Sequence, residues 1–238
     1  MAEAEPTNRY GVVTGANKGI GFAICKQLAS NGINVVLTAR DEKKGLDALE
    51  KLRHLALPAQ VVFHQLDVTD HASIKSLAHF IQNQYGKLDI LVNNAGITGA
   101  YVDGEALAAA KVVNIPNGWP KEVLSDVENL TEKKIDEILS EFLKDYKEGS
   151  LETKGWPLAI PAYSISKVAL NAYTRVLAKK YPSFCINAIC PGYVKTDINY
   201  NTGFLTPDEG AEPAVRLALL PQGSSSGLFF VRNEEKPF

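Results

Sequence analysis

The sequence is poor in cysteine and has no long apolar stretch. Three cysteines in 238 residues are too few for a disulfide framework, and they favour a reducing compartment. No run of about 18 apolar residues occurs, so we expect no membrane span. The first ten residues, MAEAEPTNRY, contain neither an apolar nor an arginine-rich amphipathic segment, so we expect no targeting peptide. The expected location is cytoplasmic.

Histidine and net charge are also scarce. The four histidines lack metal-ligand spacing, so no metal site is expected. A formal net charge of −2, with both signs mixed along the chain, predicts neither a nucleic-acid nor a membrane partner. The remaining composition, 45% hydrophobic and 22% charged, is that of an ordinary globular protein. Its length predicts one domain over residues 1–238.

Short β-branched runs alternate with helical patterns along most of the chain. The first repeat is a strand at 10–14, a helix with Ile20, Ile24 and Leu28 on one face, and a strand at 33–38. Further strands are predicted at 61–66, 88–92, 186–190 and, as the last one, 227–231; further helices are predicted at 43–53, 72–85 and 163–180, and from the capping box that begins at Thr206. This alternation predicts an α/β fold with a doubly wound parallel sheet.

A charged segment at about 117–154 interrupts this rhythm. It contains one amphipathic helix, for which Thr131 is the expected N-cap. The predicted apolar face of that helix consists of Ile135, Ile138, Leu139, Phe142, Leu143 and Tyr146. We therefore expect a helical insertion before the helix at 163–180.

A glycine-rich turn lies between the first strand and the first helix. Glycine permits a sharp turn and a close approach of the backbone to a pyrophosphate, and the helix N-terminus offers N–H groups to the phosphates. In this strand–turn–helix context the pattern favours dinucleotide binding over a tight turn without a ligand. The candidate cofactor residues of this turn are Gly15, Asn17, Lys18, Gly19, Ile20 and Gly21.

The end of the second predicted strand indicates which dinucleotide is bound. An acidic residue there usually contacts the ribose hydroxyls of NAD. This chain has Arg40 instead, whose guanidinium can pair with a 2′-phosphate, and Lys18 is a second cation. These two cations favour NADPH, although Asp41 follows directly. The alternative is that both are solvated surface charges.

Tyr163 and Lys167 are four residues apart in a predicted helix and so share one face. Tyrosine, with a pKa near 10, exchanges protons poorly at neutral pH, and a neighbouring ammonium is expected to lower that pKa. The pair is thus a candidate proton donor with its supporting cation, and Lys167 is also a candidate ligand of the nicotinamide ribose. A tyrosine and a lysine four residues apart are common in helices. The position of this pair after the nucleotide-binding half of the chain is what favours a catalytic role.

These motifs, in this order, resemble the short-chain dehydrogenase/reductase family, and the resemblance covers most of the chain. Finer wording such as KLDILVNNAG and LNAYTRVLAKKYPSF is similar to the plant branch of salutaridine and menthone/neomenthol reductases. The resemblance implies a Rossmann-type fold, a monomer, NADPH as cofactor, and Tyr163 and Lys167 as catalytic pair. It also implies cofactor contacts of Asp67 and Val68 with adenine, of Asn94 in NNAG (93–96), and of Pro191, Gly192, Val194 and Thr196 with nicotinamide.

The sequence departs from the family pattern before the tyrosine. The family has a long helix there, and then a strand that ends in a catalytic serine, which stabilises charge on the substrate oxygen. Here residues 105–110 run directly into KVVN (111–114), and Pro116 and Asn117 stand where serines are expected. We infer that a helix–strand segment is missing. Ser166, three residues after Tyr163, is a weak candidate replacement.

Two functions are consistent with this pattern. The first is NADPH-dependent reduction of a ketone or enone carbonyl, with Tyr163 as proton donor. The second is a shortened nucleotide-binding isoform with impaired catalysis. The aromatic residues Tyr200 and Phe204, in a predicted lid at 197–206, suit a small apolar substrate such as a terpenoid or alkaloid.

Overall fold

The computed structural model describes residues 8–97, 119–158 and 160–237. The chain divides into two compact units. The first unit contains the described residues up to Ile97 together with Pro191–Leu219, and the second contains the remainder. The organisation of residues 1–238 as one domain stays a prediction. Within the described ranges, no helix is both long and apolar enough to cross a membrane.

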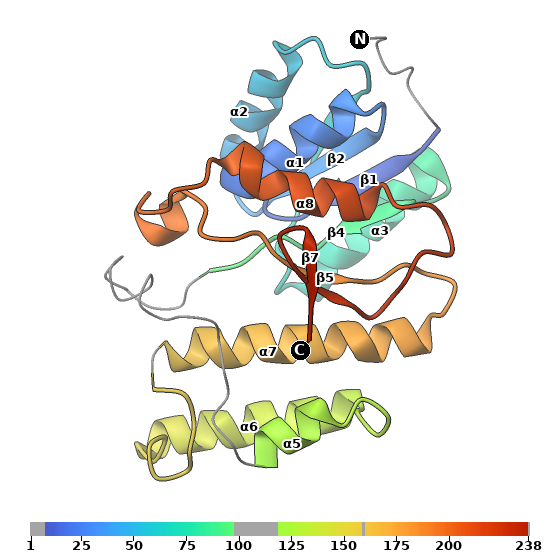
Figure 1. The fold of residues 1–238 in the computed structure, drawn as a ribbon. Helices are drawn as coiled ribbons and strands as arrows, with labels where there is room; N and C mark the ends of the chain where they lie inside the picture. The colour runs from blue at the N-terminus through green and yellow to red at the C-terminus, as the bar shows by residue number, and fades with distance from the viewer. Residues whose placement is uncertain (1–7, 98–118, 159, 238) are drawn as a thin grey trace. The chain divides into compact units, whose positions relative to one another are not determined.

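The first unit contains a four-stranded parallel sheet of order β3-β2-β1-β4. Figure 1 shows these strands with the helices around them. The strands are β1 (Tyr10–Val13), β2 (Asn34–Ala39), β3 (Val61–Gln65) and β4 (Ile90–Val92). The helices are α1 (Gly19–Ser30), α2 (Glu42–Arg53), α3 (His71–Tyr85) and α8 (Pro207–Ala218), with a 3₁₀ turn, η1, at Asp197–Asn199. The parallel α/β architecture predicted from the sequence is confirmed.

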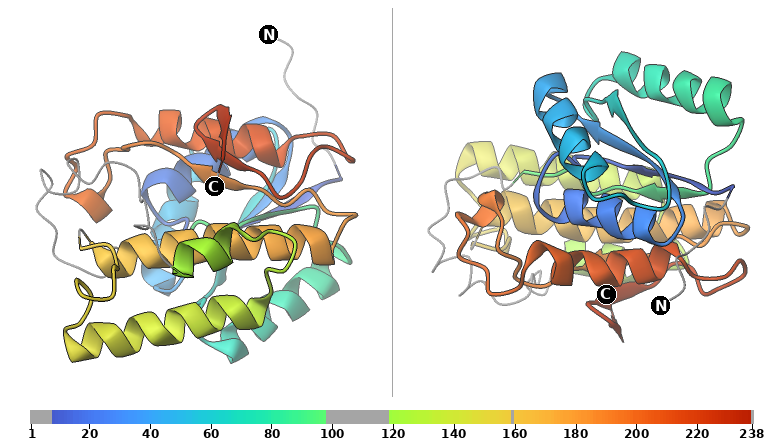
Figure 2. Two further views of the ribbon diagram at one scale, coloured as in Figure 1. Left: turned by 60° about the horizontal axis from the view of Figure 1, so that its bottom comes forward. Right: turned by 90° about the horizontal axis from the view of Figure 1, so that it is seen from above.

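Both faces of this sheet are covered because successive side chains of a strand point to opposite sides. Val13 and Leu37 pack with residues of α1, α2 and α8 in one buried cluster. Val12 and Val36 pack with Ile81 of α3 in another. Figure 2 shows α1 and α8 on one side of the sheet and α3 on the other. The sheet thus holds the carboxyl ends of its parallel strands, and the loops that follow them, at one common edge.

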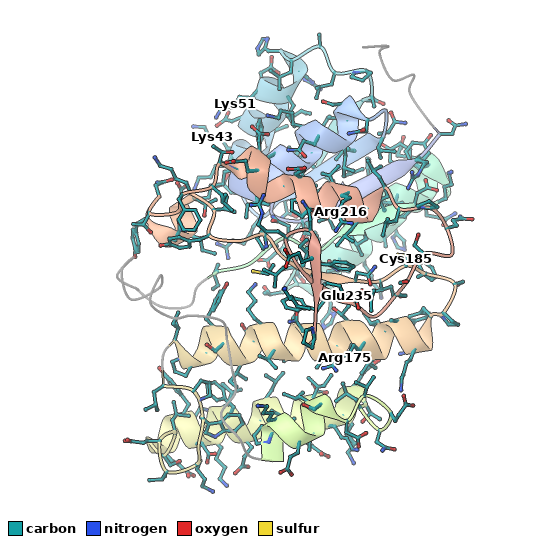
Figure 3. All side chains as sticks on the ribbon, viewed as in Figure 1. Lys43, Lys51, Arg175, Cys185, Arg216 and Glu235 are labelled. Atoms are coloured by element: carbon teal, nitrogen blue, oxygen red, sulfur yellow. The ribbon has the colours of Figure 1, made fainter. Side chains whose placement is uncertain are left out.

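The second unit is built around α7 (Pro161–Lys180) and the predicted insertion. The insertion forms α5 (Trp119–Ser125) and α6 (Glu132–Glu148), and Thr131 caps α6 through the N–H of Lys134, as predicted. Leucines and aromatic residues of the insertion share one buried cluster with Ile165, Ala169 and Ala172 of α7. Arg175 of α7 also donates from Nη2 to the carbonyl of Leu124 at 2.8 Å, which ties α5 to α7 (Figure 3).

A second sheet in this unit has the order β5-β6-β7. The strand β5 (Ala188–Cys190) is parallel to β6 (Phe229–Val231), and β7 (Glu234–Lys236) is antiparallel to β6. The prediction that 227–231 is the last strand is therefore wrong. The exposed β7, with the sequence EEK, has no apolar alternation by which it could have been recognised.

In the part of the chain that the structure describes, β4 and β5 are edge strands of their sheets. Within the described ranges β4 pairs only with β1, and β5 pairs only with β6. Leu91 of β4 is 54% exposed, although strands of a doubly wound sheet are normally buried on both faces. The candidate residues for the missing segment, 105–110, KVVN (111–114), Pro116 and Asn117, lie outside the described residues.

Candidate functional site

The glycine turn of the first unit is braced by the segment Asn93–Gly96. Gly15 has a φ of +63°, and a Cβ there would lie 2.8 Å from Cα of Ala95. A Cβ on Gly21 would lie 2.5 Å from Nδ2 of Asn94. That amide donates to the carbonyls of Thr14 and Gly15 at 2.9 and 3.1 Å. The close packing of the turn thus requires glycine at both positions, and the amide of Asn94 holds the turn through its two hydrogen bonds.

Thr14, which the sequence analysis did not single out, completes this brace. Its Oγ1 accepts hydrogen bonds from the backbone N–H groups of Asn94 and Ala95, both at 2.9 Å. The signal that could have identified it is its position as a buried polar residue directly before Gly15. A buried hydroxyl needs hydrogen-bond partners, and the NNAG segment supplies them.

The turn leads into an uncapped helix N-terminus. The helix α1 begins at Gly19, its N-cap Lys18 has extended backbone, and no side chain caps it among the described residues. The first N–H groups of a helix lack intrahelical acceptors and carry a partial positive charge. The half-buried Asn17, Gly19 and Ile20 and the buried Gly21 therefore surround a place suited to a phosphate.

Arg40 follows the carboxyl end of β2, next to the glycine turn. The N–H of Ala16 donates to the carbonyl of Thr38 at 2.8 Å, which fixes the turn to this strand two residues before Arg40. Arg40 is exposed, and its guanidinium makes no hydrogen bond or ion pair with the described residues. Asp41, in contrast, caps α2 by accepting the N–H of Lys44 at 3.0 Å. That hydrogen bond lowers the pKa of Asp41, so the carboxylate is committed to its own helix.

Asp67 and Val68 follow β3 at the same edge of the sheet. The Oδ1 of Asp67 accepts from the N–H and Oγ1 of Thr69 at 2.9 and 2.7 Å. These hydrogen bonds, and more weakly the charge of Arg40, lower the pKa of Asp67. Val68 is 46% exposed. The carboxylate of Asp67, held by Thr69, thus lies next in sequence to the exposed apolar side chain of Val68.

The segment Pro191–Thr196 lies against the glycine turn. A Cβ on Gly19 would lie 3.3 Å from Cγ2 of Thr196. Lys18 Nζ lies 2.6 Å from Oδ2 of Asp197, the next residue. Gly192 has a φ of +88°, and Val194 is buried. The first unit therefore brings together most of the predicted cofactor residues, and Asp197 is a neighbour that the sequence analysis did not foresee.

The candidate catalytic pair lies on α7 of the second unit. Tyr163 and Lys167 are half-buried, and Lys167 Nζ lies 5.4 Å from the centroid of the tyrosine ring. Burial raises the pKa of Tyr163, with a smaller contribution from Cys190. Burial also lowers the pKa of Lys167. The expectation that the ammonium of Lys167 lowers the pKa of Tyr163 is wrong, because burial of the phenol raises that pKa.

The serines of α7 are committed elsewhere. Ser166 Oγ donates to the carbonyl of Tyr163 at 2.7 Å, a hydrogen bond within the helix. Ser164 is buried, with 4% of its surface exposed. The hydroxyl of Ser166 is thus engaged within its own helix, which argues against Ser166 as a replacement for the catalytic serine.

Comparison with known proteins gives a consistent result. The family model for short chain dehydrogenases matches residues 10–115 and 149–203, and it leaves most of the insertion unmatched. The chain is 48% identical to short-chain dehydrogenase/reductase 1 from Saponaria officinalis over an alignment of 301 residues that covers 100% of each. It is 47% identical to (+)-neomenthol dehydrogenase from Arabidopsis thaliana, covering 99% of this chain and 100% of that one.

Solved structures agree. The structure of salutaridine reductase from Papaver somniferum superposes with a TM-score of 0.87 at 42% identity, covering 93% of this chain and 99% of that chain. This chain has only 238 residues, although the alignment with the Saponaria protein extends over 301. Segments of that relative therefore have no counterpart here.

Proposed function

The chain belongs to the short-chain dehydrogenase/reductase family, and we propose that it reduces the carbonyl of a small apolar ketone or enone to an alcohol with NADPH. The observation that carries this proposal is the juxtaposition of Tyr163 and Lys167 on α7. A phenol and an ammonium on one helix face form a proton donor with its supporting cation.

Bound NADPH supplies the hydride for the carbonyl carbon. Tyr163 donates its phenolic proton to the carbonyl oxygen, so that the alkoxide is neutralised as it forms. The pKa of Tyr163 is raised, so the phenol is protonated at neutral pH, as a proton donor must be. Lys167 stabilises the resulting tyrosinate and holds the nicotinamide ribose.

Arg40 and Asp41 support NADPH rather than NADH. The guanidinium of Arg40 has no partner among the described residues, whereas the carboxylate of Asp41 caps α2. In our proposal Arg40 and Lys18 bind the 2′-phosphate, and the uncapped N-terminus of α1 binds the pyrophosphate. Asp67 and Val68 contact the adenine, Asn94 braces the turn beneath the cofactor, and Pro191, Gly192, Val194 and Thr196 line the nicotinamide.

The substrate class follows from relatives and from one apolar segment. The names (+)-neomenthol dehydrogenase and salutaridine reductase describe enzymes for a terpenoid and an alkaloid. In the first unit Tyr200 is 55% and Phe204 is 81% exposed, and both follow the nicotinamide segment. We therefore propose a terpenoid or alkaloid carbonyl as substrate. We also propose that the enzyme acts as a cytoplasmic monomer, with Cys25, Cys185 and Cys190 as free thiols.

A second function is favoured by the unpaired sheet edges. In the described ranges β4 pairs only with β1 and β5 only with β6, and Leu91 is exposed. A chain without the serine strand and the helix before it would bind NADPH through the first unit and turn over slowly or not at all. This candidate is a nucleotide-binding isoform with impaired catalysis.

Replacement of Tyr163 by Phe tests the proposal. We expect turnover of menthone-like and alkaloid ketones to fall by roughly 10²- to 10⁴-fold, because general acid catalysis contributes about that factor. NADPH affinity should stay within about twofold. The matched control is Tyr173→Phe, which removes a hydroxyl from the same helix at an exposed position and should leave turnover unchanged.

The two functions give different results in this assay. NADPH binding by the wild-type chain without turnover of any ketone in the panel favours the impaired isoform. Turnover that survives in Tyr163→Phe at the wild-type rate would exclude Tyr163 as the proton donor. Turnover that is lost only in the Tyr163 variant supports the reductase.

A further inference from the structure

One ion pair of the first unit connects the glycine turn with the segment after the nicotinamide loop. Lys18 Nζ lies 2.6 Å from Oδ2 of Asp197, 179 positions further along the chain, and the two side chains are 63% and 61% exposed. This contact lowers the pKa of Asp197, so its carboxylate is charged at neutral pH. The ammonium proposed to bind a phosphate is thus already neutralised by a carboxylate of the same unit.

The local backbone holds Asp197 in place beside Lys18. Asp197 begins η1, where the side chain of Thr196 and that of Asn199 form a capping box. Asn199 is buried, and its Nδ2 donates to the carbonyl of Val194 at 2.9 Å. Thr196 itself lies against Gly19, the first residue of α1. The carboxylate is therefore fixed at the edge of the turn rather than carried on a long, freely rotating stem.

We infer that Asp197 is a specificity-determining residue, whose carboxylate competes with the 2′-phosphate of NADPH for Lys18 and so lowers the preference for NADPH over NADH. The inference rests on the proposed function, because it takes Lys18 as a ligand of that phosphate. A phosphate that binds Lys18 must either displace the carboxylate of Asp197 or lie beside this group of like charge. Both alternatives lower the affinity for NADPH. NADH carries an uncharged ribose hydroxyl at this place and escapes the competition.

Arg40 differs from Lys18 in this respect. Its guanidinium has no hydrogen bond or ion pair with the described residues, and its charge acts only weakly on Asp67. Arg40 therefore remains available to the phosphate, whereas Lys18 is available only in proportion to the strength of its pair with Asp197. Removing the carboxylate should strengthen NADPH binding, whereas loss of a merely structural contact would weaken it.

The test is a double-mutant cycle on the full chain, with dissociation constants for NADPH and NADH measured by fluorescence titration. The variants are Asp197→Asn, Lys18→Gln and the combination of the two. We expect Asp197→Asn to tighten NADPH binding about two- to fivefold, the range of exposed ion pairs, and to leave NADH unchanged. The gain should shrink with rising salt, because the groups are exposed. In the Lys18→Gln background, Asp197→Asn should have no effect on NADPH.

Asp208→Asn is the matched control. Asp208 pairs with Lys26 at 2.5 Å in the same unit, so this variant removes an equal charge without touching Lys18. NADPH affinity should not change. An equal gain in Asp208→Asn, or a gain that persists without Lys18, would attribute the effect to net charge and overturn the inference.

The remaining outcomes are also decisive. Weaker binding of both cofactors in Asp197→Asn would make the carboxylate a structural anchor of the loop and overturn the inference, while the proposed function stands. A wild-type chain that binds NADPH and NADH equally, with no response to Lys18→Gln, would contradict the proposed cofactor itself. Circular dichroism of each variant separates these results from loss of the fold.

Discussion

At the scale of single residues, the arrangement around Arg40 shows how two adjacent charges acquire opposite roles. Both Arg40 and Asp41 follow β2, and the sequence alone leaves open which of them meets the ribose. The structure commits Asp41 to the N–H of Lys44 and leaves Arg40 uncommitted. A carboxylate at a helix N-cap is stabilised by the hydrogen bond that it accepts from its own helix. It is therefore a poor acceptor for a hydrogen bond from a ribose hydroxyl.

Arg40→Gln should therefore weaken NADPH binding far more than NADH binding. We expect the dissociation constant for NADPH to rise roughly 10- to 100-fold, since a hydrogen bond to a charged group contributes about 1.5–3 kcal/mol. NADH affinity should change by less than about twofold. Arg53→Gln, at the exposed end of α2 where Arg53 pairs with Glu50, is the control and should affect neither cofactor. Equal losses for both cofactors would place Arg40 away from the 2′-phosphate.

The sequence predicted most residues of the glycine turn because their requirements are local. A positive φ at Gly15 and a close backbone approach at Gly21 leave a recognisable spacing. Asp197 could not be predicted in the same way, since its contact with Lys18 depends on how distant segments fold together. The raised pKa of Tyr163 was likewise out of reach, because desolvation depends on tertiary burial rather than on the spacing to Lys167.

At the scale of elements, strong local signals were predicted well and weak ones were missed. Thr131 and Thr206 cap their helices as expected, because capping boxes and N-caps are short-range interactions. The seven-residue α5 was missed, since such a helix is stabilised mainly by packing. Leu143 and Tyr146 were assigned to the apolar face of α6, but each is 55% exposed. The buried face of this helix is therefore narrower than the apolar face that the sequence predicts.

The strand β4 offers a test of the sheet around the missing segment. Ile90 is 5% exposed and packs in the core with α1 and α8, whereas its neighbour Leu91 is 54% exposed. We expect Ile90→Ala to lower the free energy of unfolding by about 2–5 kcal/mol, the usual cost of a core truncation. Leu91→Ala should cost less than about 1 kcal/mol, as at a surface position.

Urea denaturation measures both values, with an unchanged m-value as the sign that only stability has changed. A cost for Leu91→Ala close to that for Ile90→Ala would show that the second face of β4 is covered in the folded protein. The pair of variants thus reports on one face of the same strand at a time.

At the scale of the whole molecule, the chain is shorter than the alignment with a relative of its own family. The alignment with the Saponaria relative covers both chains fully over 301 residues, while this chain has 238. The described strands form two sheets rather than one continuous sheet. A doubly wound sheet gains its stability from cover on both faces, and loss of a helix–strand pair from such a sheet would remove buried apolar area.

Thermal unfolding with and without NADPH tests the molecule as a whole. A ligand that binds only the folded state stabilises it by about 2.7 kcal/mol at a hundredfold excess over its dissociation constant. For a protein of this size, each kcal/mol raises the melting temperature by roughly 2–4 °C, so we expect a shift of about 5–10 °C with NADPH. The same concentration of NADH should give a clearly smaller shift, because it lacks the 2′-phosphate for Arg40.

Calorimetry distinguishes the possible results. One cooperative transition that NADPH raises above NADH means that the chain folds around the cofactor despite its missing segment, and the Tyr163 assay then decides whether it is catalytic. Two transitions, only one of which responds to NADPH, would mean that the two units unfold separately and would contradict the single domain predicted for residues 1–238. Absence of any cooperative transition would mean that the chain lacks native packing, and both proposed functions would fail together.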